Sequence, residues 1–286
     1  MKKHVRKRIF IEKLIKRIMV FSSVSIMVVL ALIMFVIIQK GAPSMTWDMV
    51  SKVPGGGFYL GKEGGVLNAI LGSLYLAIGG TVIAFIISLP LALYLETYLK
   101  NSVWGDRVRL VLDILWGVPS IVYGAFAFIL MIYVGMRASL LAGIVTLALL
   151  EIPILARAMD EVFRRMPKEL TLSALALGST KSELGIKIII PQMLPGIVTG
   201  VMLAFGRGIG DAASVLFTAG YTDRIPSSLM RPVASLPLAV FFQLGTPFPE
   251  VQNRAYASAL ILTLIVLTIS LLSRLVIWRL GKYVIR

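Results

Sequence analysis

An arginine and an aspartate lie four residues apart inside a long apolar stretch, in the sequence GRGIGD. Charged side chains are costly in the core of a membrane, about 2.5–3.5 kcal/mol for an arginine on insertion scales, so they usually face a polar cavity or a partner. The spacing predicts that Arg207 and Asp211 meet on one helix face. A guanidinium matches two oxygens of a phosphate group at once. The pair therefore predicts an anion-selective point in a pathway, and a structural ion pair between helices is the alternative.

Three glycines and two further charged residues extend this candidate site. Gly206, Gly208 and Gly210 flank the arginine and remove side-chain bulk, which lets a backbone or a substrate approach closely. Arg157, near the end of another apolar stretch, is a second candidate for the pathway, and an arginine that snorkels to the interface is the alternative. Glu151 lies deeper in that stretch and is predicted to face the interior, protonated or paired with an unidentified partner.

The sequence argues against several other kinds of site. It contains no cysteine and one histidine, so no thiolate or imidazole metal site is expected. The run 56–62 approaches a phosphate-binding P-loop, but Glu63 replaces the Ser or Thr that would hold magnesium. The excess of 29 Lys and Arg over 14 Asp and Glu lies in short segments beside apolar stretches, which indicates membrane orientation and not nucleic-acid binding. We therefore expect no metal, no cofactor and no enzymatic activity in this chain.

The elements that position these residues are predicted to be membrane helices. Of the 286 residues, 58% are hydrophobic, and the mean hydropathy is +0.89. A helix needs about 20 apolar residues to cross a bilayer, and long uninterrupted apolar runs favour helices over barrel strands. Pro90, Pro119 and Pro153 lie inside such runs, and each can kink its helix. The predicted spans are 18–38, 68–95, 109–134, 139–159, 194–218 and 255–278.

The distribution of Lys and Arg predicts which ends of the spans face the cytoplasm. These residues concentrate in alternate connecting segments, which makes the basic segment 1–17 and the tail 282–286 cytoplasmic. The first apolar stretch exceeds the ~7–15 residues of a signal-peptide core, so 18–63 is predicted as an uncleaved first helix and an outer loop. The outer segments 39–67 and 219–254 are rich in Gly and Pro, as expected of either turn-rich connectors or a docking surface.

A polar segment between the fourth and fifth spans, LSALALGSTKSELGIKIIIP, carries a recognisable pattern. It resembles the cytoplasmic coupling motif of ABC-importer permeases, whose short helices press into a cleft of a separate ATPase. Leu172 and Ser173 stand where the family usually has Glu-Ala, and Ile190 stands for its Leu. The resemblance implies a coupling loop over 160–193. The residues implied in ATPase coupling are Ser173, Ala174, Ala176, Leu177, Gly178, Ile188 and Pro191.

Further segments resemble phosphate permeases of the PstA type. They are GGVLNAILGSLYL (Gly64–Leu76), GVPSIVYGAF (Gly117–Phe126) and the run Arg164–Gly220. The resemblance implies an all-α integral membrane protein with six transmembrane helices and a cytoplasmic coupling-helix loop between the fourth and fifth spans. Residues 64–281 would then form the ABC-importer permease domain.

The same resemblance implies roles for the charged residues. In that family, arginines at the positions of Arg207 and Arg157 are held to matter for phosphate transport. The family's R-x-x-G-E ends in a glutamate, whereas this chain has the shorter Asp211, so the role of this acid stays open.

The implied function is the permease subunit of an ATP-driven phosphate importer in the cell membrane. The implied partners are membrane lipid, a PstC-like permease, an ATPase dimer that binds ATP and magnesium, and an extracytoplasmic phosphate-binding protein. A second copy of this chain is the alternative to the PstC-like partner. The alternative functions are a permease for molybdate or sulfate, a passive anion channel or secondary transporter, and a structural subunit of a partner permease.

Overall fold

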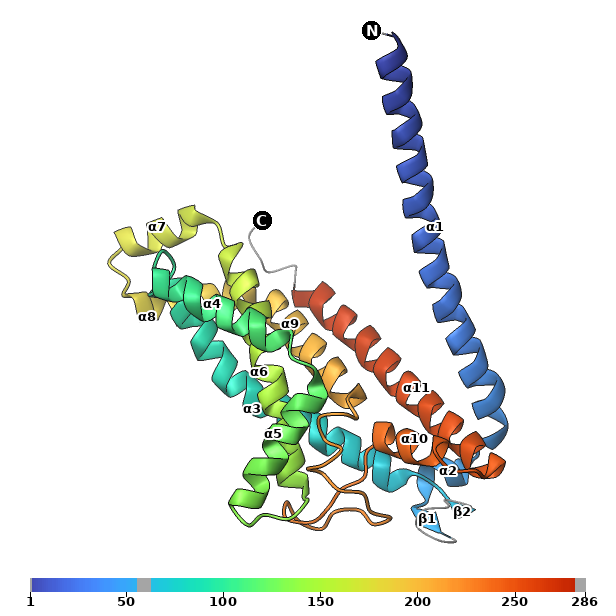
Figure 1. Ribbon diagram of the computed structural model, residues 1–286. Helices are drawn as coiled ribbons and strands as arrows, with labels where there is room; N and C mark the ends of the chain where they lie inside the picture. Colours follow the sequence, from blue (N-terminus) through green and yellow to red (C-terminus); the bar gives the residue numbers. More distant parts are fainter. Residues whose placement is uncertain (1, 56–62, 281–286) are drawn as a thin grey trace.

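The computed structural model describes residues 2–55 and 63–280, which form a helical bundle with one long helix extending away from it (Figure 1). The P-loop-like run lies mostly outside the described residues, as does the tail 282–286. The elements in chain order are α1 (Lys2–Gly41), η1 (Ala42–Ser44), α2 (Trp47–Ser51), β1 (Pro54–Gly55), β2 (Glu63–Gly64), α3 (Leu67–Thr97), α4 (Val103–Trp116), α5 (Ser120–Tyr133), α6 (Leu140–Arg164), α7 (Lys168–Ala176), α8 (Lys181–Glu183), η2 (Leu184–Ile189), α9 (Ile190–Gly210), α10 (Leu236–Leu244) and α11 (Pro249–Leu280).

The predicted all-α membrane architecture is confirmed. Five helical segments of the described residues are long and apolar enough to cross a membrane, and α4 with α5 would make a sixth span as a bent pair. The five segments are Lys7–Ser44, Leu67–Thr97, Leu140–Arg164, Lys181–Gly210 and Pro249–Arg279. α1 begins at Lys2, so the basic N-terminal segment continues into the first span as one helix. Strands β1 and β2 pair antiparallel, with Pro54 opposite Gly64.

The predicted third span, 109–134, is wrong as a single straight helix. α4 ends at Trp116, α5 begins at Ser120, and the two helices meet at an angle of 96°. Pro119 causes the break, because its ring disfavours helical backbone at the preceding residue and it has no N–H to donate. The N–H of Gly117 closes α4 by donating to the carbonyls of Asp113 and Ile114. Of the three prolines that could kink a span, only this one separates two helices, since α3 and α6 run through theirs.

The predicted end of the fifth span, at residue 218, is also wrong. α9 ends at Gly210, and Asp211 has an extended backbone with ψ of 120°. Oδ1 of Asp211 accepts a hydrogen bond of 2.8 Å from the N–H of Ser214, so this side chain stabilises a turn in place of another helical turn. The apolar run 212–219 therefore folds back against the bundle, although its composition is that of a membrane helix.

The core of the bundle is the packing of α3 against α6, which small residues make close. A Cβ at Gly79 would lie 2.6 Å from Ile144, and a Cβ at Gly143 would lie 2.6 Å from Leu76. Such glycines let helix backbones approach closely where there is no hydrophobic driving force between helices in lipid. α6 is the most buried of the candidate spans, with 72% of its apolar window inside the protein. It therefore lies at the centre, and the candidate site forms on it.

The second Gly- and Pro-rich segment packs into the bundle. The N–H groups of Ser139 and Leu140, at the start of α6, donate to the carbonyls of Thr218 and Arg231. The N–H of Leu236 donates to the hydroxyl of Ser73 on α3 at 2.8 Å. These bonds satisfy backbone groups that the bilayer core would leave without partners. The segment is thus part of the packed fold, and it connects α9 to α11 through turns and the short helix α10.

The polar ends of the helices divide between two ends of the molecule. The start of α1, the helices α7 and α8, and the end of α11 lie toward one end (Figure 1). The hairpin β1–β2, α2 and α10 lie toward the other end. The predicted coupling segment is therefore on the same side as the basic N-terminal end of α1, as the alternation of charge requires.

Candidate functional site

Arg207 lies on an exposed face of α9, close to the end of the helix. A Cβ at Gly206 or Gly210 would meet no atom within 4 Å, so the arginine is flanked by open space. The opposite face of the same turn is buried and includes Ala204 and Ile209. The guanidinium of Arg207 interacts electrostatically with Tyr123 of α5. Arg207 forms no ion pair within the described residues, so this face of α9 presents an exposed positive charge.

The predicted meeting of Arg207 and Asp211 on one helix face is wrong. The helix ends between them at Gly210, and no ion pair joins the two side chains in the described part of the chain. The carboxylate of Asp211 is occupied by the N–H of Ser214, and it lies within electrostatic reach of Glu151. A four-residue spacing brings side chains together only while the backbone stays helical.

Glu151 is a fully buried acid behind the exposed face of α9. A Cβ at Gly208 would overlap its carboxylate, so the glycine makes room for the acid. Neither carboxylate oxygen has a hydrogen-bond partner within 3.5 Å in the described residues, although the hydroxyl of Thr81 lies close enough to interact with the acid. A buried polar group without a partner is costly. The predicted inward direction of Glu151 is confirmed, whereas its partner stays unidentified.

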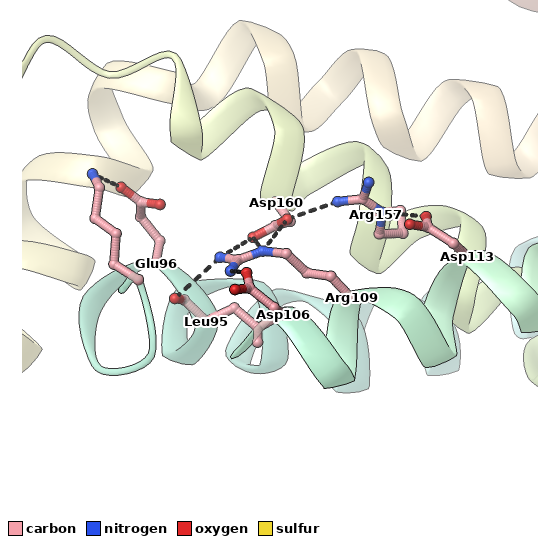
Figure 2. Close-up of polar contacts among 8 residues, drawn as sticks. Leu95, Glu96, Asp106, Arg109, Asp113, Arg157 and Asp160 are labelled. Carbon is pink, nitrogen blue, oxygen red and sulfur yellow. Dashed lines mark hydrogen bonds and ion pairs between the residues drawn. The ribbon is translucent and has the colours of Figure 1, made fainter. Parts of the chain in front are cut away.

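Arg157 takes part in an ion-pair network between α4 and α6 (Figure 2). Its Nε donates to Oδ1 of Asp113 at 2.6 Å, and its Nη1 donates to Oδ2 of Asp160 at 2.9 Å. Arg109 holds Asp160 from the other side, with Nε to Oδ2 at 2.9 Å and Nη2 to Oδ1 at 3.1 Å. Nη2 of Arg109 also donates to the carbonyl of Leu95 at 3.3 Å. Arg157 is thus held in place by Asp113 and Asp160 and does not snorkel freely to the membrane interface.

The members of the network on α4 differ in exposure, and the most exposed of them is Asp106, whose Oδ1 lies 3.6 Å from Nη1 of Arg109. Arg109 is buried, and Asp160 on α6 is fully buried, so this bidentate pair is shielded from solvent. The Arg157 side chain is 19% exposed and that of Asp113 is 47% exposed. The network therefore has a fixed inner pair and an outer pair that solvent reaches.

Three members of this network, Arg109, Asp113 and Asp160, are not among the site residues predicted from the sequence. Arg109 and Asp113 are four residues apart in RLVLD, a spacing that suggests an ion pair with each other. Each instead bonds to α6. The one available signal was two opposite charges inside an apolar run, which predicts an inward-facing pair but not its partners.

The coupling segment consists of α7, a turn, α8 and the π-helix η2. Gly178 forms the turn with φ of +86°, a backbone conformation that favours glycine, and nothing lies within 4 Å of the position of its Cβ. α8 is capped by a reciprocal pair in which the Thr180 hydroxyl accepts from the N–H of Glu183 and the Glu183 carboxylate accepts from the N–H of Thr180. The turn is therefore set by local bonds and projects from the bundle.

The seven predicted coupling residues separate by exposure. Ala174 is buried, and Ile188 packs against the same core cluster, so these two anchor the segment. Leu177 is 88% exposed, a large apolar side chain in solvent at the tip of the turn. The other exposed members are Ser173, Ala176, Gly178 and Pro191. An exposed apolar tip of this kind is typical of a surface that binds another protein.

Comparison with solved structures agrees with this geometry. The fold is similar to the permease of the MetNI methionine ABC transporter in an inward-facing conformation, with a TM-score of 0.62 at 18% identity. The match covers 75% of this chain and 95% of that chain. An amino acid ABC transporter gives a TM-score of 0.57, covering 74% of this chain and 92% of its own. The fold is thus shared with chains of two ABC transporters.

Sequence comparison gives the family. The model for the binding-protein-dependent transport system inner membrane component matches residues 88–282. The phosphate transport system permease protein PstA of Yersinia pestis is 36% identical over 213 residues, which cover 74% of this chain and 72% of that protein. PstA of Haemophilus influenzae is 34% identical over 244 residues, 85% of each chain. The chain belongs to the PstA family of inner-membrane transport permeases, whose members are not enzymes.

Proposed function

We propose that this chain is a permease subunit of an ATP-driven importer of inorganic phosphate. The observation that carries the proposal is the exposed Arg207 between glycines that open onto free space. A guanidinium in a low-dielectric wall attracts an anion and can offer two parallel donors to phosphate oxygens. The PstA relatives are phosphate transport permeases by name, which supports this choice of anion over molybdate or sulfate.

The face of α9 that carries Arg207 forms one wall of the pathway, and a second permease forms the opposite wall. That partner is a PstC-like chain or a second copy of this chain. The open space at Gly206 and Gly210 supports a missing wall, because a packed bundle leaves few such voids. An extracytoplasmic binding protein delivers phosphate to the end of the molecule where the hairpin β1–β2 and α10 lie (Figure 1).

The coupling segment binds a separate ATPase dimer in the cytoplasm, and ATP and magnesium bind to that dimer. The termini are cytoplasmic and the chain lies in the inner or plasma membrane, surrounded by lipid. The common side of α7, α8 and the start of α1 supports this orientation, together with the basic residues at that end. Leu177 at the tip of the turn supplies the apolar contact with the ATPase.

The test is ATP-dependent uptake of ³²P-labelled phosphate into vesicles that contain the assembled transporter, with an Arg207→Gln variant. We expect uptake to fall at least tenfold while the complex still assembles, because one charged hydrogen-bond donor is lost. Arg137→Gln is the matched control, because Arg137 is exposed in the turn between α5 and α6 and away from α9. A native complex that hydrolyses ATP without moving phosphate would refute the proposal, and competition with molybdate and sulfate would then identify the anion.

A further inference from the structure

We propose that Asp113 is a built-in competitor for the anion at Arg157, so that its carboxylate displaces phosphate from a second arginine and releases it on the ATPase side. This inference rests on the proposed function. It adds a release residue, Asp113, beside an arginine that the family resemblance already implicates in phosphate transport.

The two carboxylates that hold Arg157 are not equivalent. Asp160 is fully buried, and Arg109 already binds it through both oxygens, so it cannot leave without exposing a buried arginine. Asp113 is 47% exposed, and Arg157 donates to only one of its oxygens. The exposed carboxylate is therefore the partner that an incoming anion can replace.

Arg157 has the capacity to bind an anion in place of Asp113. In the described part of the chain its Nε and Nη1 are used, and its Nη2 makes no hydrogen bond. If Asp113 moved away, Nε and Nη2 would point along one edge of the guanidinium. That edge offers the paired donors that match two phosphate oxygens. The carboxylate of Asp113 thus lies where a phosphate oxygen would bind.

The position of Arg157 suits release. α6 and α9 run antiparallel, with Gly208 against Glu151 and Gly196 against Val162. On this register Arg157 lies nearer the coupling segment than Arg207, by roughly 8 Å at 1.5 Å per residue. Tyr123, within electrostatic reach of Arg207, donates through its hydroxyl to the carbonyl of Leu115, two residues after Asp113. The bend between α4 and α5 therefore lies near both Arg157 and Arg207.

The chemistry explains the need for a competitor. An arginine that attracts phosphate also retains it, and transport requires binding weak enough to allow departure. A carboxylate on the partly exposed side of the guanidinium replaces the lost hydrogen bonds as the phosphate leaves. Arg157 is then never left without an anionic partner, and the cost of emptying the station is lowered.

The experiment measures phosphate binding by the assembled transporter in nanodiscs, by equilibrium dialysis with ³²P-labelled inorganic phosphate and no ATP. The variant Asp113→Asn keeps the shape and removes the charge. We expect this variant to bind phosphate about tenfold more tightly than the native protein. This factor is at the low end of the effect of one charge-assisted hydrogen bond, because Asp113 is half exposed. We also expect its uptake rate at saturating phosphate to fall.

Three further variants make the result specific. Asp106→Asn removes a 78% exposed carboxylate from the same helix. Asp106 pairs with Arg109 at 3.6 Å and forms no ion pair with Arg157 in the described residues, so the phosphate affinity of this variant is expected to equal the native value. Asp113→Glu retains the competing charge and should bind as the native protein does. In Asp113→Asn combined with Arg157→Gln, the tighter binding should disappear.

Two results would overturn the inference. One is unchanged or weaker phosphate binding by Asp113→Asn in a complex that assembles normally by size-exclusion chromatography. The other is tightening that persists without Arg157. Failure of the proposed function is distinguished by the native complex alone, because ATP hydrolysis without phosphate uptake refutes that function and this inference with it.

Discussion

The carboxylate of Glu151 on α6 occupies the space that a side chain on Gly208 of α9 would fill, so the two helices meet here through an acid packed against a glycine. One residue earlier, Arg207 projects from the other side of α9 into open space. The same helical turn thus packs against a buried acid and exposes a base. The predictions below test the consequences of this arrangement and of the ion-pair network.

Replacement of Gly208 by alanine should destabilise the protein by about 1–3 kcal/mol, because the added methyl group would force α9 away from Glu151. The thermal unfolding midpoint of the purified protein in detergent measures this effect. Gly206→Ala is the matched control, since its Cβ meets open space, and it should be neutral or slightly stabilising through better helix propensity. Equal midpoints for the two variants would contradict the observed packing.

Replacement of Glu151 by glutamine should leave the unfolding midpoint unchanged or raise it. The carboxylate is fully buried and has no hydrogen-bond partner within 3.5 Å in the described residues. A neutral amide of the same shape removes this buried charge and still accepts from the nearby Thr81 hydroxyl. The same melting assay gives the answer. A loss of several degrees would mean that the acid has a partner, such as a cation or a group on the second permease.

Replacement of Asp160 by asparagine should instead lower the free energy of unfolding by about 3–5 kcal/mol. The substitution leaves Arg109 buried beside a neutral group. Asp106→Asn is the control for a lost α4 carboxylate, and it should change stability by less than about 0.5 kcal/mol.

The pair can also be removed as a unit. The double variant Arg109→Met with Asp160→Leu should recover most of the stability lost in Asp160→Asn, because no unpaired charge remains. A double variant as unstable as the single one would show that the ion pair itself, and not the isolated charge, determines the energy. Chemical denaturation monitored by tryptophan fluorescence suits both comparisons.

Replacement of Leu177 by aspartate should prevent ATPase binding while the melting temperature stays within about two degrees of the native value. The side chain is exposed at the turn and contributes little to folding, and a charge there opposes an apolar contact. Co-purification of the ATPase with the permease measures the binding. Leu229→Asp is the control, because Leu229 is an exposed leucine in the segment between α9 and α10.

A second substitution tests the turn itself. Gly178→Ala should weaken ATPase coupling by a different route, since φ of +86° costs a residue with a Cβ about 1 kcal/mol or more. We expect this variant to stimulate the ATPase less than the native protein does, while the permease complex still co-purifies normally. Full activity in both variants would place the coupling surface elsewhere on the chain.

Much of this protein follows from the sequence alone. Long apolar runs in water-free surroundings must form helices, because every backbone group needs a partner within its own segment. The apolar runs predicted the helices, the alternation of Lys and Arg predicted their orientation, and the charge at Arg207 predicted the candidate anion site, whereas the coupling segment was identified by its resemblance to a family motif. Each of these predictions depends on residue types and on spacings of a few residues, which can be read directly from the sequence.

The tertiary structure decided what local spacing could not. The run 212–218 is as apolar as a membrane-spanning segment. The helix α9 nevertheless ends before Asp211, because the Asp211 side chain accepts a hydrogen bond from the N–H of Ser214. Arg109 and Asp113 lie four residues apart on α4, a spacing at which they could pair with each other. Each instead bonds to a residue of α6, because the bend at Pro119 lets α4 pack against α6. The partner of a charge depends on which helix lies opposite, and that is fixed by the packing of α3, α6 and α9 as a whole.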